Sequence, residues 1–239
     1  DEKGERVVIT IKADDSIQLN GMNLTKDEVV ARVNALAGDL IVVTGDLVDG
    51  RPAARKNDLA PIRGLKASDG VYFVSGNHEF YGEWTAWQQI YADWNLRFLR
   101  NECVAVRPDL VIGGLDDQVL MGCPESVFYP QPAVESVFAT APQGAFRVLL
   151  QHRPTEARQN LEKTFFHLQL SGHTHGGVMP GMATLVSWHN AGFVRGLYTL
   201  ADDSRLYVST GTGQWAGFPM RFFNDSEITV FKLKKAETK

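Results

Sequence analysis

Residues 40–50 read Leu-Ile-Val-Val-Thr-Gly-Asp-Leu-Val-Asp-Gly, and this stretch decides the fold. The continuous apolar run over 39–44 predicts a buried strand, and Gly45 lets the backbone turn sharply where that strand ends. Asp46 is then held on a rigid element at the carboxyl end of the strand. The arrangement returns at 71–79, where Val-Tyr-Phe-Val-Ser is followed by Gly-Asn-His-Glu.

Further strands and helices alternate outward from these two motifs. Thr25 and Glu28 form a capping box, and apolar residues at helical spacing follow, which predicts an amphipathic helix. A second helix is expected at 85–95. Further strands are expected at 6–11, 111–112, 147–150, 167–170, 205–209 and 228–233. The last two alternate apolar and polar side chains, which predicts half-exposed antiparallel strands.

The order of these elements predicts an α/β fold in one domain over residues 1–239, with a parallel or mixed sheet covered by helices. The net charge is -4 and 44% of the residues are hydrophobic, so we expect no electrostatic binding of nucleic acid. No apolar run reaches the roughly 18 residues of a membrane-spanning helix.

Four polar side chains that are able to bind metal each lie just past an apolar strand: Asp46, Asn77, His152 and His173. In open α/β sheets, ligands bind outside the carboxyl ends of the strands. We therefore expect these side chains to converge on one rim. A lone histidine after a strand is more often structural than a ligand, so the assignment of His152 depends on the other three.

The strongest local signal is the hexapeptide 172–177, Gly-His-Thr-His-Gly-Gly. Two histidines at i and i+2 would point to opposite faces of a regular strand. The flanking glycines free the backbone to bend, so we expect His173 and His175 to turn toward one site. Neutral imidazole is a common ligand of transition metals.

The other histidines are interpreted singly. His78 is a candidate general acid, because histidine carries a proton near neutrality. His167 and His189 match no motif. We interpret His167 as a strand-start residue and His189 as a surface or loop residue.

In this order, the signatures Gly-Asp-x-x-Asp-Gly, Gly-Asn-His-Glu, a strand-end histidine and Gly-His-Thr-His-Gly-Gly resemble the calcineurin-like metallophosphoesterase superfamily, and within it a bacterial branch of small phosphoesterases. The resemblance runs from about residue 29 to residue 233. It implies a four-layer α/β/β/α sandwich with two mixed sheets. It also implies hydrolysis of a phosphomonoester or phosphodiester with two divalent metal ions, for which manganese, iron and zinc are the candidates.

The resemblance also implies a role for each matching residue. His78 would protonate the leaving group, and Asp49 would hold His78 in orientation. The metal ligands would be Asp46 as the bridge between two ions, His175 on the first ion, and Asn77, His152 and His173 on the second.

The chain departs from this family at the first strand, where the family has an Asp-x-His motif that binds the first metal. No histidine precedes His78. Three alignments are open: Asp14 with Ser16, or Gln18 in place of the histidine with either Ser16 or Asp15 in place of the aspartate. In each, the histidine ligand is absent. The first ion would then be held loosely through Asp14 or Asp15, or its site would be empty. The alternative interpretation is that Asp14 and Asp15 are solvated loop residues that bind no ion.

The leading hypothesis is metal-assisted hydrolysis of a small phosphoester, with a lipid or a nucleotide derivative as the substrate class. The missing first motif motivates an alternative, a metal-binding scaffold with impaired turnover that binds a phosphate ligand or a partner. A nuclease is disfavoured, because no basic groove interleaved with aromatic residues is visible.

The loop over 211–223 supplies two substrate-binding candidates, Trp215 and Arg221. Its aromatic side chains would line a pocket for an amphiphilic substrate or make a peripheral membrane contact, and packing in the core or at the rim is the competing interpretation. The compartment stays open between a peripheral cytoplasmic bacterial protein and an exported one whose N-terminal anchor was removed.

Overall fold

Strand β4 (Leu40–Val43) sends alternate side chains into two different cores. Ile41 and Val43 pack against helices, whereas Leu40 and Val42 pack between two sheets. Burial on both faces explains why this strand is a continuous apolar run. The computed structural model describes residues 6–9, 17–19, 22–118, 133–178, 181–213 and 226–234, with only the backbone up to residue 24.

The described strands form two mixed sheets and a short hairpin. The first sheet has the order β13 (Thr229–Lys232), β1 (Arg6–Ile9), β4, β5 (Val71–Phe73) and β6 (Arg97–Phe98), and only the β13–β1 pair is antiparallel. The second has the order β11 (Gly196–Thr199), β12 (Arg205–Val208), β10 (Leu168–Ser171), β9 (Phe146–Leu150), β8 (Leu110–Gly114) and β7 (Glu102–Arg107), with antiparallel pairs at its two edges. The hairpin joins β2 (Ile17–Leu19) to β3 (Met22–Leu24).

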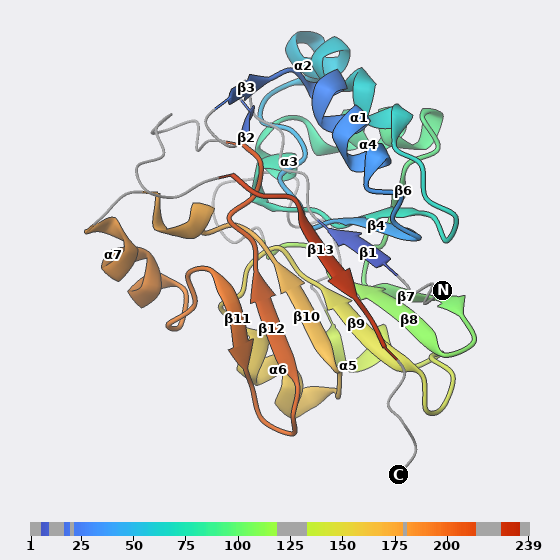
Figure 1. Cartoon of the computed structure of the whole chain (residues 1–239), viewed down its shortest axis with the longest axis vertical. Coiled ribbons are helices and arrows are strands. Elements are labelled where there is room, and N and C mark those ends of the chain that lie inside the picture. Colours follow the sequence, from blue (N-terminus) through green and yellow to red (C-terminus); the bar gives the residue numbers. More distant parts are fainter. Residues whose placement is uncertain are drawn as a thin grey trace.

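Helices cover the outer face of each sheet, so that four layers result (Figure 1). The helices on the first sheet are α1 (Lys26–Ala35), α2 (Pro52–Leu59) with the 3-10 turn η1 (Ala60–Gly64), α3 (Asn77–Tyr81) and α4 (Trp84–Asp93). Those on the second sheet are α5 (Val134–Val137) and α6 (Ala157–Lys163). The four-layer α/β/β/α sandwich with two mixed sheets is therefore confirmed.

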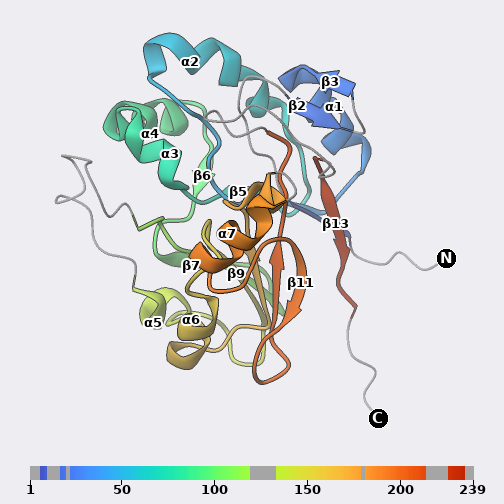
Figure 2. The same cartoon turned by 90° about the vertical axis from the view of Figure 1, so that its left-hand side faces the viewer.

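The remaining helix, α7 (Met182–His189), lies apart from these layers, beside β11 in Figure 1 and in front of the sheets in Figure 2. No helix in the described ranges is both long and apolar enough to cross a bilayer.

The expected capping box is present, because Thr25 Oγ1 accepts from the Glu28 backbone N–H while the Glu28 carboxylate accepts from the Thr25 N–H. The expected direction of the late strands was only partly right. β13 is antiparallel to β1, but β12 runs antiparallel to β11 and parallel to β10. The alternating pattern in β12 reflects Leu206 and Val208 packing on one face, and it carries no information on strand direction.

His167 precedes β10, as expected for a strand-start residue, and its environment makes stability depend on pH. Its Nδ1 accepts the Arg147 backbone N–H at 2.9 Å, and its ring stacks on Phe146. Burial, assisted by the charge of Arg147, lowers the pKa of His167 below its ordinary value.

A lowered pKa means that the folded state disfavours the charged imidazolium form of His167. The contribution of the neutral ring to the unfolding free energy is therefore complete above the unfolded pKa of about 6.5, and it is lost as the pH falls below that value. We expect His167→Asn, which keeps an acceptor for the Arg147 N–H, to flatten the fall in unfolding free energy between pH 7 and pH 5. Urea titrations at several pH values measure this, and parallel curves for the two proteins would contradict it.

Candidate active site

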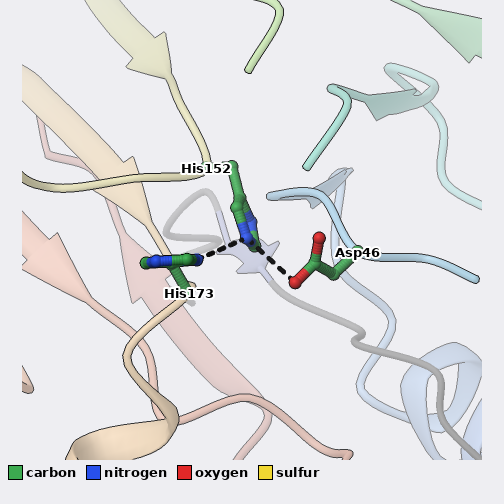
Figure 3. A group of neighbouring side chains, drawn as sticks. All are labelled: Asp46, His152 and His173. Carbon is green, nitrogen blue, oxygen red and sulfur yellow. Dashed lines mark hydrogen bonds and ion pairs between the residues drawn. The ribbon is translucent and has the colours of Figure 1, made fainter. Parts of the chain in front are cut away.

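Side chains from the carboxyl ends of both sheets meet at one point. Asp46 follows β4 of the first sheet, while His152 and His173 follow β9 and β10 of the second. One donor atom from each lies within 4.8 Å of the others, and Figure 3 shows the three side chains pointing toward one another. The convergence that the strand ends predict is therefore present for these residues.

The hydrogen bonds of His152 define which of its nitrogens faces the cluster. The ring is fully buried, and Nδ1 lies 2.7 Å from the Thr44 carbonyl oxygen. A carbonyl can only accept, so Nδ1 carries a proton, and Nε2 is the nitrogen that faces the cluster. That Nε2 lies 3.0 Å from Asp46 Oδ2 and 3.2 Å from His173 Nδ1.

Two glycines, Gly45 and Gly76, allow the loops that follow β4 and β5 to approach closely. A Cβ on Gly76 would lie 2.2 Å from Asp46 Oδ1, and one on Gly45 would lie 2.6 Å from the Gly76 nitrogen. Gly45 and Asp46 also have positive φ angles of 91° and 54°, a conformation that non-glycine residues rarely adopt. Such backbone strain is often found at functional sites.

The buried Glu79 carboxylate ties the two loops of the first sheet together. Oε2 accepts the backbone N–H groups of Asp46 at 2.9 Å and Gly76 at 2.6 Å, and Oε1 accepts those of Leu47 and Val48. Burial raises the pKa of Glu79 to about 7, and the charge of Asp46 adds to the rise while the N–H donors oppose it. Glu79 thus fixes the position of Asp46 through its backbone.

The candidate acid His78 lies beside the cluster on α3. Its Nδ1 is 2.9 Å from Asp49 Oδ1, which is close enough for the carboxylate to orient the ring. Its backbone N–H donates to Asp46 Oδ1 at 3.0 Å, so the acid and the ligand candidate are held in a fixed relation.

Asp46 and His173 of the cluster line a cavity of about 240 Å³ together with the predicted residues Asn77, His78 and His175. Its polar lining consists of Asp46, Asn77, His78, His173, Thr174, His175, His189 and Asn190. His189, which we expected on the surface or in a loop, is exposed but closes α7 and lines this cavity.

The bend in the 172–177 segment is carried by the histidines as well as by the glycines. His173 and His175 have φ angles of 71° and 48°, and His175–Gly177 form the 3-10 turn η3. Thr174 fixes the segment by donating its hydroxyl to the Val194 carbonyl at 2.6 Å.

Several predicted site residues lie outside the described residues: Asp14, Asp15, Ser16, Trp215 and Arg221. Gln18 lies on β2, of which only the backbone is described. These assignments stay predictions.

The residues that are described fit a transition metal ion. The lone pair of His152 Nε2 and the Asp46 carboxylate repel each other at 3.0 Å unless a proton or a cation lies between them. The buried Asn77 Oδ1 accepts no hydrogen bond from the described part of the chain. Mixed nitrogen and oxygen donors are the set that manganese, iron and zinc accept.

Asp117 is a buried neighbour of the site that our sequence reasoning missed. Arg153, which directly follows His152, donates its Nε–H to Asp117 Oδ2 at 2.9 Å. Burial raises the pKa of Asp117, while the nearby His152 and Arg153 oppose that rise. Strand β8 ends in Gly113-Gly114 and is followed by Leu-Asp-Asp at 115–117, much as Thr-Gly-Asp follows β4, and this repetition was the available signal.

Comparisons with known proteins point to one family. A family model described as calcineurin-like phosphoesterase matches residues 23–177. An uncharacterized metallophosphoesterase of Campylobacter jejuni is 34% identical, covering 87% of this chain and 54% of that protein. A transmembrane protein with metallophosphoesterase domain from Danio rerio is 31% identical, covering 87% and 48%. The chain thus spans about half the length of these relatives.

Solved structures show the same fold. A dimetal phosphatase from Danio rerio has a TM-score of 0.54 at 11% identity, covering 87% of this chain and 88% of that one. The NAD nucleotidase of Haemophilus influenzae has a TM-score of 0.54 at 17% identity, covering 87% and 45%. At such identities the likeness concerns the fold alone.

We expect Glu79→Gln to lower the unfolding free energy by about 1–3 kcal/mol at pH 8, because the amide NH₂ would face backbone N–H donors that need an acceptor. Urea unfolding of the metal-free protein measures this. Glu162→Gln, at an exposed position on α6, is the matched control and should stay within about 0.5 kcal/mol. Equal losses in the two variants would contradict the role of Glu79.

Proposed function

The chain belongs to the calcineurin-like phosphoesterase family. From this we propose that it is a phosphoric ester hydrolase, and that it cleaves a phosphomonoester or phosphodiester of lipid or nucleotide origin at the Asp46–His152–His173 cluster. The observation that carries the proposal is the approach of these three donors within 4.8 Å, next to the His78–Asp49 pair. A polar cluster with a purely structural role would not require a further imidazole, His78, that lines the same cavity and is paired with its own carboxylate, Asp49.

Asp46, Asn77, His152 and His173 would hold one divalent ion, and Asp46 with His175 would hold a second. The likeness in fold to a dimetal phosphatase supports two ions. Manganese, iron and zinc remain the candidates, with Asp14 or Asp15 as further ligands of the first ion. When bound, such ions polarise phosphoryl oxygens and lower the pKa of water.

The chain's own residues supply position and a proton. Thr44 fixes His152, and Glu79 fixes the backbone of Asp46, so neither ligand has to reorganise when the phosphoryl group binds. His78 lines the cavity and would hold the proton that the departing ester oxygen requires. Asp49 would keep the His78 ring directed into the cavity.

A proton donor matters most for a poor leaving group. We expect His78→Ala to lower kcat/KM for phenyl phosphate or diphenyl phosphate by about 10²–10⁴, and to lower it much less for the p-nitrophenyl esters, because nitrophenolate leaves without a proton. The assay is run with added manganese and repeated after treatment with a chelator.

His167→Asn, far from the cavity, is the histidine control for that experiment. Equal losses on both classes of ester would assign His78 a structural role. Activity that survives both His78→Ala and the chelator would overturn the mechanism.

Metal content separates the enzyme from the scaffold alternative. We expect the protein, stripped and then reloaded with manganese, iron or zinc, to bind two ions per chain and to hydrolyse ester, and His173→Asn to lose at least one ion. Elemental analysis measures the ratio. One ion per chain with no turnover would favour the scaffold that binds a phosphate ligand.

A further inference from the structure

Helix α7 is apolar, yet none of its side chains is fully buried. Its sequence, Met-Ala-Thr-Leu-Val-Ser-Trp-His, has no Asp, Glu, Lys or Arg, whereas a surface helix of a globular protein usually turns charged residues to water. Leu185 is 51% exposed and Trp188 is 78% exposed. An exposed apolar element of this kind commonly marks a binding surface.

The helix is fixed in this exposed position. At its start, Ala183 packs so closely on Gly177 that a Cβ on this glycine would lie 2.9 Å from the Ala183 Cβ. At its end, the buried Asn190 donates to the Val186 carbonyl at 2.9 Å and accepts from the Thr155 hydroxyl at 3.3 Å. Gly177 belongs to the same 3-10 turn as His175, so α7 is attached directly to the metal-site segment.

One stripe of α7 forms a wall of the catalytic cavity. The residues of this stripe follow the spacing i, i+3, i+4 and i+7, and they are Met182, Leu185, Val186 and His189. Trp188 falls outside the stripe. The same cavity is lined by the candidate metal ligands Asp46, Asn77, His173 and His175 and by His78. It is therefore polar at one end and apolar along the helix, and Figure 2 shows α7 lying in front of the sheets.

We propose that the phosphoester cleaved here carries an aliphatic chain that lies along the Met182–Leu185–Val186 wall. This inference rests on the proposed function, because it takes the phosphate end of the substrate to bind at the Asp46–His152–His173 cluster. The wall offers an aliphatic chain apolar contact. It would leave the polar groups of a nucleoside without hydrogen-bond partners, which costs binding free energy. A lipid-type phosphoester therefore fits the cavity better than a nucleotide.

The test measures binding separately from turnover. The probes are n-alkylphosphonates from ethyl to octyl, which cannot be hydrolysed, with a nucleoside phosphonate for comparison. Isothermal titration of the manganese-loaded protein, below the micelle concentration of each probe, gives Kd. We expect Kd to fall about two- to fourfold per added methylene until the wall is covered, and the nucleoside phosphonate to bind no better than the butyl probe.

Two leucine variants make the test specific. Leu185→Ser should weaken octylphosphonate binding about tenfold and flatten the dependence on chain length. Leu197→Ser, the same substitution at a 62% exposed leucine on β11 that does not line the cavity, should keep that dependence. No dependence on chain length in the unmodified protein, or equal effects of the two variants, would overturn the proposal.

The outcomes for the two proposals are distinguishable. Hydrolysis of phenyl esters without dependence of phosphonate binding on chain length would leave the proposed function standing and remove the aliphatic substrate. Dependence on chain length without any hydrolysis would retain the apolar site and remove the catalytic proposal.

Discussion

The hydrogen bond from His152 to the Thr44 carbonyl joins the two sheets at the rim where the site is built. Its partners are 108 residues apart in the sequence and belong to different sheets. The bond fixes the orientation of the His152 ring, so that Nε2 faces Asp46 and His173. A sandwich that allowed the sheets to slide would lose this bond and with it the spacing of the donor atoms.

The surroundings of this bond concentrate negative charge. Asp46, Glu79 and Asp117 are all buried, and Arg153 pairs with Asp117 at 2.9 Å. Burying several carboxylates close together is costly, and the raised pKa values of Glu79 and Asp117 are one expression of that cost. A bound divalent cation would offset it. The grouping of buried carboxylates and the proposed binding of a cation would therefore have the same physical origin.

The sequence allowed the grouping of Asp46, His152 and His173 to be predicted, because apolar strands followed by polar residues reveal the carboxyl edge of a sheet. The four layers were predictable only through the family resemblance. The role of Glu79 was not predictable from the sequence, since a carboxylate that accepts backbone N–H groups leaves no periodic pattern. Helix α7 was missed for a related reason: it lacks the polar face from which amphipathic periodicity is recognised. The direction of β12 depends on pairing partners distant in sequence, which alternation of side chains does not reveal.

The separation in sequence of the donors also affects how the protein folds. An unfolded chain cannot present Asp46, His152 and His173 together, since closing so long a loop costs conformational entropy. A cation that these donors select would bind the native state and not the unfolded one, and the native population would then grow with the free ion concentration. During translation from the N-terminus, all three donors are present only when β10 of the second sheet has emerged from the ribosome. The resistance of this protein to unfolding would then depend partly on the metal supply around it.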